Sequence, residues 1–396
     1  MKKVLIVTDW LGCDGASKSL VSLLGCIDYE ILSVDLMLLD NRDDFFRSMI
    51  PDEVRVIDPP KDIDAYFSPL HTAAWRLLSL GRLSLLSLRI CQAILIRLAR
   101  NTISTIQRVW IRAVSHLDRL PEGYDVIISY QDIWSAYYVA LCGTAPIKIS
   151  WNHNDYVKTK RLPEIDTVMM KHLSYLVTVS EERQKQLSAS LPDFQQKIQV
   201  LPNILSSRLI HKMSGEIGGF EDDFQGYRVL TIGRLDHQKG IDIAIDACKL
   251  LIDRGFKVRW YVLGFGDAVL YKRQLDHLNL KDSFVFLGTE ANPYPYIRQC
   301  DVYVQPSRFE GFGLALAEAR ILRKPCVVSD IDVFRKQIEH NHNGVVSFLD
   351  PVSVADNVQK ILSNTELQDR FGRNLAKEQI GNEYAVKKFY KLLGVS

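Results

Sequence analysis

A pair of cationic side chains five positions apart is the first feature that suggests chemistry. In the segment T-I-G-R-L-D-H-Q-K-G, Arg234 and Lys239 follow an apolar run, and Gly233 permits a tight turn before them. Arginine can bind two phosphate oxygens at once, and lysine acts as a mobile point charge. A helical pattern over residues 241–254 follows, and the N-terminal end of a helix favours anions. We therefore expect a diphosphate site, with a solvated surface loop as the alternative.

A second segment, Q-P-S-R-F-E-G-F-G-L-A-L-A-E-A, has the same order of strand, tight loop and helix. Gly311 and Gly313 lie on either side of Phe312, so the backbone there can approach a ligand and offer N–H groups to an anion. Glu310 precedes these glycines on the loop and is expected to face the ligand. Glu318 lies about two turns into a helix of Leu and Ala, and its side chain leans toward the helix N-terminus. A carboxylate that accepts two hydrogen bonds suits a ribose diol. An ordinary turn and a half-exposed helix acid are the alternatives.

Short apolar runs alternate with helical patterns along most of the chain, which is typical of parallel βαβ units. Strands are expected near Lys3–Thr8, Glu30–Leu38, Val54–Asp58, Asp125–Ser129, Ile147–Trp151, Tyr175–Ser180, Ile198–Leu201, Tyr227–Gly233, Val258–Gly264, Phe284–Gly288, Val302–Gln305, Pro325–Ser329 and Gly344–Phe348. Residues 206–226 are rich in glycine and acids and are interpreted as a linker.

The sequence thus predicts an α/β protein with two doubly wound, Rossmann-like domains that face a central cleft. We expect a first domain over residues 1–205 and a second domain over residues 206–380. A last helix within 381–396 is expected to return to the first domain.

Composition restricts the class of protein. A chain of 396 residues is too long for one core, and 47% hydrophobic with 24% charged residues is ordinarily globular. A net charge of +2 argues against a polyanion binder, and seven scattered cysteines favour a reducing compartment. The apolar run at the N-terminus is too short for a signal peptide, and no apolar run in the chain is long enough to span a bilayer. We expect a cytoplasmic protein, with or without attachment to a surface.

The two motifs together resemble a known family. G-R-L-x-x-x-K-G followed by P-S-x-x-E-G-F-G-x-x-x-x-E-A is similar to the retaining, GT-B-fold glycosyltransferases of family 4, of the polysaccharide-biosynthesis type. The resemblance covers nearly all of the second half and the first half more loosely. It implies that residues 1–205 form an acceptor-binding domain and that residues 206–380 form a nucleotide-sugar-binding domain. It implies that Arg234 and Lys239 hold the donor diphosphate, that Glu318 binds the ribose, and that Glu310 contacts sugar and phosphates. The implied donor-binding positions are Gly233, Gly264, Gly311, Phe312, Gly313, Leu314 and Glu318.

The first half carries two further segments at strand ends. T-D-W-L-G-C-D-G-A-S-K-S lacks the G-x-G-x-x-G of dinucleotide-binding oxidoreductases. It resembles the family's glycine loop, with Asp14 and Ser17 at positions where glycine and glutamate are usual, and Gly15 is its implied substrate-binding residue. S-W-N-H-N-D-Y is similar to the W-x-H-x-D signature of polysaccharide-building members. That resemblance makes His153 an active-site histidine that touches donor sugar or acceptor. For Asp155, a substrate-binding role and a structural role are equally open alternatives.

The family's chemistry, as implied by the resemblance, retains the anomeric configuration without an assured covalent intermediate. The catalytic residues are then expected to be His153, Glu310, Arg234 and Lys239, and the main demand is stabilisation of negative charge on the departing diphosphate. No metal and no other cofactor are expected. The one D-x-D, Asp330-Ile-Asp332, is a weak metal candidate.

A long stretch of the first half contains arginine but no acid. Between Asp64 and Asp118 there is no Asp or Glu, and in one continuous helix the arginines would lie within an arc of about 140°. These arginines are Arg76, Arg82, Arg89, Arg97, Arg100, Arg108 and Arg112. A basic amphipathic region over residues 75–115 predicts binding to a membrane surface. Core-packed helices with solvated arginines are the alternative, and nucleic acid is not expected.

Together these features predict transfer of a hexose or N-acetylhexosamine from a nucleotide sugar, with a UDP-sugar favoured, to a lipid-linked glycan. The expected setting is synthesis of a bacterial capsule, O-antigen or exopolysaccharide at the inner face of the cell membrane. A sugar-nucleotide epimerase on the same fold and a non-catalytic sugar-nucleotide-binding scaffold are the alternatives.

Overall fold

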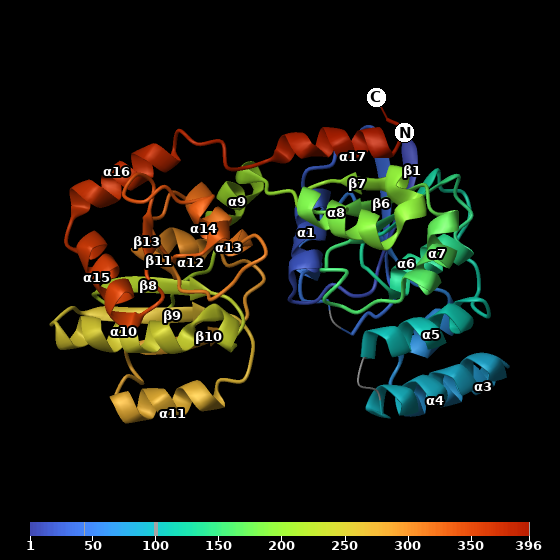
Figure 1. The fold of residues 1–396 in the computed structure, drawn as a ribbon, viewed down its shortest axis with the longest axis horizontal. Helices are drawn as coiled ribbons and strands as arrows, with labels where there is room; N and C mark the ends of the chain where they lie inside the picture. The colour runs from blue at the N-terminus through green and yellow to red at the C-terminus, as the bar shows by residue number, and fades with distance from the viewer. Residues whose placement is uncertain (43, 99–101, 396) are drawn as a thin grey trace. The chain divides into compact units, whose positions relative to one another are not determined.

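The computed structural model describes residues 1–42, 44–98 and 102–395, and the chain forms two compact units (Figure 1). Unit 1 consists of Met1–Ile204 together with Glu383–Ser396, and unit 2 consists of Leu205–Asn382. Each unit is a parallel sheet with helices on its faces, the arrangement that alternating apolar runs and helical patterns predict.

The described residues of unit 1 form a seven-stranded sheet in the order β3-β2-β1-β4-β5-β6-β7, with every neighbouring pair parallel. Its strands are β1 (Lys2–Thr8), β2 (Leu32–Leu38), β3 (Arg55–Ile57), β4 (Val126–Ser129), β5 (Ile147–Asn152), β6 (Tyr175–Thr178) and β7 (Ile198–Val200). The strands are apolar along their length because both faces of a parallel sheet are covered. All of these strands confirm predictions from the sequence.

The helices of unit 1 connect these strands or continue from them. They are α1 (Gly15–Leu24), α2 (Lys61–Phe67), α3 (Leu70–Ser79), α4 (Leu83–Leu98), α5 (Thr102–Val114), α6 (Trp134–Cys142), α7 (Pro163–His172), α8 (Glu181–Ser190) and α17 (Val386–Leu392). The predicted return of the last helix is confirmed, because the Phe389 ring centroid lies 6.1 Å from that of Trp151. The hydroxyl of Tyr390 also accepts a hydrogen bond from the Asp28 N–H at 2.7 Å.

The described residues of unit 2 form a six-stranded sheet in the order β10-β9-β8-β11-β12-β13. Its strands are β8 (Tyr227–Ile232), β9 (Val258–Leu263), β10 (Phe284–Gly288), β11 (Val302–Gln305), β12 (Cys326–Ser329) and β13 (Val345–Ser347). Each lies where the sequence predicts a strand. The chain moves outward in one direction from β8 and in the other from β11. The strand order therefore reverses between the neighbouring strands β8 and β11. Such a switch point is where open α/β sheets bind ligands.

The helices of unit 2 flank this sheet on both faces (Figure 1). They are α9 (Ser207–Ser214), α10 (Ile241–Asp253), α11 (Val269–Leu278), α12 (Tyr294–Gln299), α13 (Leu314–Ile321), α14 (Asp332–Arg335), α15 (Pro351–Leu362) and α16 (Thr365–Leu375).

The predicted linker over residues 206–226 is wrong. Its first part is the helix α9, which Ser206 caps by accepting a hydrogen bond from the Leu209 N–H. Its second part is held by Asp222, whose carboxylate pairs with Arg228 and Arg259 at 2.8 and 3.0 Å. The glycines and acids suggested a free connection, but the acid has cationic partners on two strands of unit 2.

The basic region over 75–115 is not one continuous helix, so the predicted arc of arginines is also wrong. Gly81, with a φ of +69°, separates α3 from α4. Arg100 lies outside the described residues. Among the residues that the structure describes, no helix is long and apolar enough to cross a bilayer.

Several arginines of this region have partners within unit 1. Arg76 pairs with Asp64 and Arg82 with Asp118, the two acids that border the acid-free stretch. Arg89 donates a hydrogen bond from Nε to the backbone oxygen of Tyr66 at 2.9 Å. These side chains therefore bind the helices to the unit instead of forming one basic face.

Candidate functional site

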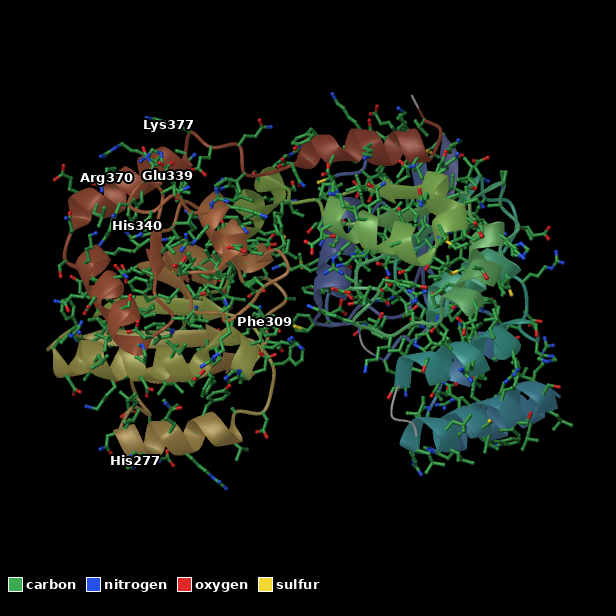
Figure 2. All side chains as sticks on the ribbon, viewed as in Figure 1. His277, Phe309, Glu339, His340, Arg370 and Lys377 are labelled. Carbon is green, nitrogen blue, oxygen red and sulfur yellow. The ribbon has the colours of Figure 1, made fainter. Side chains whose placement is uncertain are left out.

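The loops that follow β8 and β11 are joined into one surface at the switch point of unit 2. The Arg308 N–H donates to the Gln238 backbone oxygen at 2.8 Å, and Gln238 Nε2 donates to the Phe309 backbone oxygen at 3.0 Å. The Arg308 guanidinium also makes two hydrogen bonds to Asp242, at 2.9 and 2.6 Å. Figure 2 labels Phe309 on this surface. The two motifs that the sequence places far apart thus form one site.

Two glycines allow the backbones of neighbouring loops in this site to lie in close contact. Gly240 has a φ of +67°, and a Cβ there would lie 2.0 Å from the Pro306 backbone oxygen. A Cβ on Gly264, whose φ is +155°, would lie 1.9 Å from the Gly233 backbone oxygen. No larger residue fits at either position without movement of the backbone, because real Cβ atoms do not approach so closely.

Lys239 and Glu310 are brought together by this joining of loops. The Lys239 ammonium lies 2.6 Å from Glu310 Oε1, and both side chains are mostly buried. Ser307 Oγ donates to the same carboxylate oxygen at 2.9 Å, and Gln305 donates to Ser307 at 2.9 Å. Lys239 is therefore a cation fixed by a buried carboxylate, which corrects the sequence interpretation of a mobile charge.

Arg234 remains half-exposed on the same surface. Its Nη2 lies 3.2 Å from Asp236 Oδ2 and donates to Gln238 Oε1 at 3.1 Å. Because these contacts lie at the surface, they leave the guanidinium accessible to an anion.

The N-terminus of α13 carries the glycine-rich part of the second motif. Gly313 is the N-cap residue, and its left-handed φ of +80° favours glycine. A Cβ there would lie 2.8 Å from a ring carbon of Phe334. Phe312 is exposed beside it, its backbone oxygen accepts a hydrogen bond from Gln337, and Leu314 begins the helix. Gly311 precedes Phe312 on the same loop.

Glu318 is buried, with 1% of its surface exposed, so the alternative of a half-exposed helix acid is excluded. It is the fifth residue of α13, one turn from the helix start and not the two that the sequence suggested. The Tyr294 hydroxyl donates to Glu318 Oε1 at 3.2 Å. Burial, followed by the charge of Glu318, raises the pKa of Tyr294, so the phenol remains a donor. A buried carboxylate is costly, and such groups cluster at functional sites.

In unit 1, His153 follows β5 and is positioned by an acid from the neighbouring strand end. The N–H groups of His153 and Asn154 donate to the Asp132 carboxylate at 2.9 and 3.3 Å. The imidazole packs 5.0 Å from the Tyr130 ring, centroid to centroid. Burial lowers the pKa of His153, so the ring is neutral near pH 7. Its Nε2 is buried and has no hydrogen-bond partner among the described residues.

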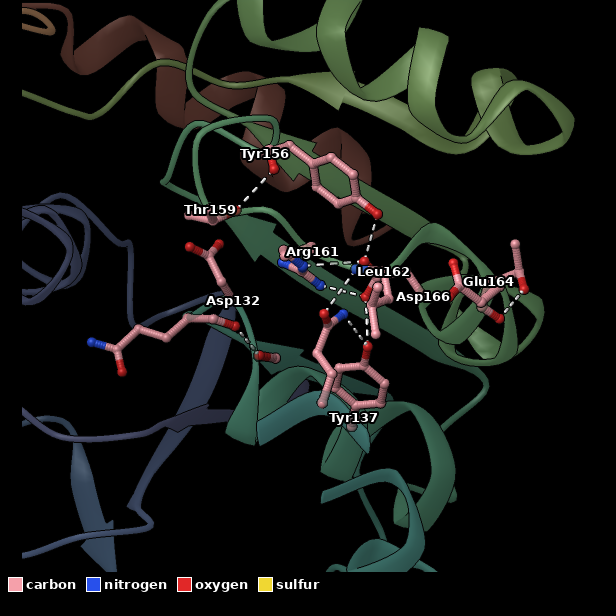
Figure 3. Close-up of polar contacts among 12 residues, drawn as sticks. Asp132, Tyr137, Tyr156, Thr159, Arg161, Leu162, Glu164 and Asp166 are labelled. Carbon is pink, nitrogen blue, oxygen red and sulfur yellow. Dashed lines mark hydrogen bonds and ion pairs between the residues drawn. The ribbon is translucent and has the colours of Figure 1, made fainter. Parts of the chain in front are cut away.

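The loop that leads from β5 to α7 is anchored by a buried polar network (Figure 3). Arg161 pairs with Asp166 at 2.6 Å. The hydroxyls of Tyr137 and Tyr156 donate to the same carboxylate at 2.6 and 2.5 Å. Three donors on one buried carboxylate hold this loop in one conformation, and the loop carries His153 at its start.

The carboxylate of Asp155 is directed to its own loop. It accepts hydrogen bonds from the N–H groups of Val157 and Lys158 at 3.1 and 3.0 Å. The structure therefore accounts for this acid by a local turn and does not bring it into the contacts of His153.

The glycine loop after β1 is organised by the residue that departs from the family pattern. Asp14 is the N-cap of α1 and accepts hydrogen bonds from the N–H groups of Ala16 and Ser17 at 2.9 and 3.0 Å. A Cβ on Gly15 would meet nothing within 4 Å, so the space around this position does not require a glycine. A carboxylate of the chain itself occupies the helix end.

Two acids at the switch point of unit 1 were missed from the sequence. Asp9 follows β1, is buried, and accepts a hydrogen bond from the Ser135 N–H at 2.7 Å. Burial raises the pKa of Asp9 to about 7. Asp132, which positions His153, follows β4. A signal was present, because both acids come directly after buried strands at the predicted ligand-binding edge.

No group of three metal-binding side chains occurs among the described residues. In the D-x-D segment, the Asp330 carboxylate accepts a hydrogen bond from Arg335 Nη2 at 2.6 Å.

Comparison with known proteins points to one family. The family model for glycosyl transferases group 1 matches residues 223–378. A phosphatidyl-myo-inositol mannosyltransferase of Mycobacterium tuberculosis is 30% identical over 154 residues, covering 37% of this chain and 41% of that protein. The capsular polysaccharide biosynthesis glycosyltransferase CapM of Staphylococcus aureus is 23% identical over 157 residues, 39% of this chain and 41% of that protein. The match therefore spans about two fifths of the length of these relatives.

Similarity of structure extends over the whole chain. HepE of Anabaena, crystallised with UDP-glucose, superposes with a TM-score of 0.65 at 16% identity, covering 100% of both chains. TarM of S. aureus, in a complex that includes UDP, gives a TM-score of 0.63 at 12% identity, covering 99% of this chain and 100% of that one. The fold of two Rossmann-like units is therefore GT-B, as predicted.

Proposed function

We propose that this chain, whose residues 223–378 belong to the glycosyl transferases group 1 family, transfers a hexosyl or N-acetylhexosaminyl unit from a nucleotide sugar to a lipid-linked glycan. The observation that carries the proposal is the joined surface of unit 2, where Arg234 and the Lys239–Glu310 pair lie on the two linked loops and Glu318 is buried on α13, the helix that follows the second loop. A UDP-sugar is favoured by HepE and TarM, which were crystallised with UDP-glucose and UDP. CapM supports a role in bacterial surface polysaccharide synthesis.

The proposed reaction retains the configuration of the sugar, as in family 4. The acceptor oxygen forms a bond to the anomeric carbon on the face from which the diphosphate leaves. The bond from that carbon to the diphosphate oxygen breaks, and the acceptor proton passes to this oxygen. Arg234 and Lys239 stabilise the growing negative charge, and preorganised charges of this kind supply the largest catalytic term in many enzymes. Because Glu310 fixes Lys239 in advance, little reorganisation is needed during the reaction.

The remaining groups would bind the two substrates. Glu318 accepts hydrogen bonds from the ribose diol, and the backbone at Gly311–Gly313 contacts phosphates and sugar. His153, which is neutral and whose buried Nε2 has no hydrogen-bond partner among the described residues, would make a hydrogen bond to a hydroxyl of the donor sugar or the acceptor. The proposal requires no metal and no other cofactor.

We also propose that the protein is cytoplasmic and binds peripherally to the inner face of the cell membrane. Support comes from large apolar side chains that are exposed on α3 and α4, among them Trp75, Leu83 and Leu98. A lipid-linked acceptor would be reached from that surface.

Saturation-transfer NMR against UDP-, GDP- and ADP-sugars tests the donor assignment. We expect transfer to UDP-sugar protons in the natural chain and its loss in Glu318→Ala, with Glu318→Gln as the matched control of shape. Donor signals that are unchanged in Glu318→Ala would contradict the site. Turnover distinguishes the alternatives, because an epimerase converts donor without acceptor and a scaffold binds donor without converting it.

A further inference from the structure

The outermost helices of unit 1 present an unusual apolar surface. Figure 1 shows α3 and α4 at the edge of this unit, with α5 between them and the rest. Trp75 is 71% exposed, Leu83 65% and Leu98 77%. Other large apolar residues exposed on the same helices are Leu70, Leu78, Ile90, Ile94 and Leu95. Single exposed apolar residues are common, whereas a contiguous group marks an interaction site.

On α4 these residues form one stripe. At 100° per residue, Leu83, Ile90, Ile94 and Leu98 lie on one side of the helix. The buried residues Leu85 and Gln92 lie on the opposite side. We call the stripe, together with Trp75 and Leu78 of α3, the apolar ridge.

The charges around the ridge fit a bilayer surface. Arg97, Arg108 and Arg112 are exposed on α4 and α5, and the sequence has no acid between Asp64 and Asp118. Exposed arginines on α4, which carries the stripe, and on α5, which packs against α4, are typical of helices that lie on a membrane surface, where basic residues lie near the headgroups.

A cavity of about 580 Å³ lies beside the ridge. Its lining includes Asn41, Asp58, Lys61, Asp64, Arg76 and Leu80. Asn41 and Asp58 follow β2 and β3, so the cavity lies at the carboxyl edge of the sheet. Arg76 is on α3 and Leu80 follows it directly, so α3 contributes residues both to the lining of the cavity and to the apolar ridge.

The cavity is polar but formally neutral, and this decides which ligand it suits. Asp58 and Asp64 are balanced by Lys61 and Arg76, and the Arg76 guanidinium is already paired with Asp64. A phosphate would meet two carboxylates and no excess of cations. Sugar hydroxyls both donate and accept hydrogen bonds, so carboxylates, an amide and cations together can satisfy them. The volume lies within the range of small-ligand sites, roughly 300–1,000 Å³.

We propose that this cavity binds the uncharged sugar headgroup of a glycolipid whose acyl chains lie against the apolar ridge. The inference deepens the proposed function and rests on it for the identity of the glycolipid as acceptor. β3 and β5 are four strand positions apart in the sheet. At about 4.8 Å per strand, the cavity lies roughly 19 Å from the loop of His153 along the sheet edge. The acceptor would therefore be an oligosaccharide, with its lipid-proximal end in the cavity and its growing end near His153.

Vesicle cosedimentation tests the inference with three compositions. These are phosphatidylcholine alone, phosphatidylcholine with monoglucosyl diacylglycerol, and phosphatidylcholine with phosphatidylglycerol at the same mole fraction. We expect the natural chain to bind the glycolipid vesicles about tenfold more tightly than phosphatidylcholine alone, a difference of about 1.4 kcal/mol. Water-soluble methyl glucoside at the same concentration should not release the protein, since it lacks the acyl chains.

Three variants separate the cavity from the ridge. The double variant Asp58→Asn, Lys61→Gln should lose the additional affinity for glycolipid vesicles. Its binding to vesicles of phosphatidylcholine alone should be unchanged. Leu83→Gln with Leu98→Gln should remove binding to every vesicle. Val352→Gln, at an apolar residue that is 53% exposed on α15 of unit 2, is the control and should behave as the natural chain.

Three results would overturn the inference. The first is equal binding of the natural chain to vesicles with and without glycolipid. The second is full replacement of glycolipid by phosphatidylglycerol, which would indicate an anionic surface only. The third is a dimer in sedimentation that the ridge variant converts to monomer, which would assign the ridge to a second copy.

The failure of this inference is distinguishable from failure of the proposed function. Glu318→Ala should bind glycolipid vesicles as the natural chain does. If the protein binds glycolipid but turns over no nucleotide sugar, the proposed function is contradicted and the glycolipid site is retained. If it turns over a nucleotide sugar but does not bind glycolipid, the glycolipid site is contradicted and the proposed function is retained.

Discussion

The ligand-binding edges of the two units differ in how their side chains are supplied. In unit 2, Arg234, Lys239, Glu310 and Glu318 come from two short motifs that follow the neighbouring strands β8 and β11. In unit 1, His153 depends on Asp132 from another strand end. The comparison indicates that the proposed diphosphate and ribose site is encoded in local motifs. The proposed acceptor side instead requires groups that only the folded sheet brings together.

The largest expected effect is on the donor side. Glu318→Ala should lower kcat/KM for the nucleotide sugar by about 100- to 1,000-fold, because a buried charge-assisted hydrogen-bonding group is worth roughly 3–4 kcal/mol. Donor affinity should fall with it, as measured by titration calorimetry with UDP. Glu318→Gln should retain more activity, since the Tyr294 hydroxyl keeps an acceptor. Undiminished UDP affinity in Glu318→Ala would contradict a role in ribose binding.

On the acceptor side, His153→Ala should separate turnover from donor binding. We expect kcat to fall by about 10- to 100-fold, within the range for a positioned hydrogen-bonding group, with UDP affinity unchanged. Steady-state kinetics and calorimetry on the same preparation measure both. A parallel loss of donor affinity would place His153 with the donor and weaken the contrast between the two units.

The buried acid at the switch point of unit 1 gives a pH-dependent prediction. Because burial raises the pKa of Asp9 to about 7, the folded state binds its proton more tightly than the unfolded state does. Its contribution to stability is therefore fully present below about pH 4 and is lost as pH rises through 7. Asp9→Asn should be more stable than the natural chain by about 1–3 kcal/mol at pH 8. Urea unfolding should show the difference disappear near pH 4, and a constant difference across this range would contradict the buried-charge account.

The smallest effects concern two glycines with opposite surroundings. Gly264→Ala should destabilise unit 2 by about 1–3 kcal/mol, because its φ is left-handed and a Cβ would meet the Gly233 backbone oxygen. Gly15→Ala is the matched variant in unit 1 and should change stability by less than about 0.5 kcal/mol. Urea unfolding of both measures the contrast. Equal destabilisation would show that the loop after β1 is as constrained as the donor site.

Much of the architecture was predictable because it depends on local patterns. Each predicted strand is present, since apolar runs of a few residues between helical patterns identify buried parallel strands. The motifs around Arg234 and Glu318 were recognisable because residues close in sequence form each loop.

The errors arose where distant residues act on a segment. Residues 206–226 have the composition of a linker, but Asp222 is bound by arginines of β8 and β9. The arginines over 75–115 suggested a basic face. Acids that border that stretch pair with Arg76 and Arg82, so fewer arginines are unpaired than the sequence suggested, and large apolar side chains are exposed on the same helices.

The sequence by itself determined the parallel sheets and the two motifs of unit 2 on which the proposed donor site rests. Only the tertiary structure decided that Glu310 fixes Lys239, that Glu318 is buried, that Asp14 closes the N-terminus of α1, and that Asp132 positions His153. The physical reason is that strand and turn preferences are properties of neighbouring residues. Burial and ion pairing depend instead on which strand ends the sheet places side by side.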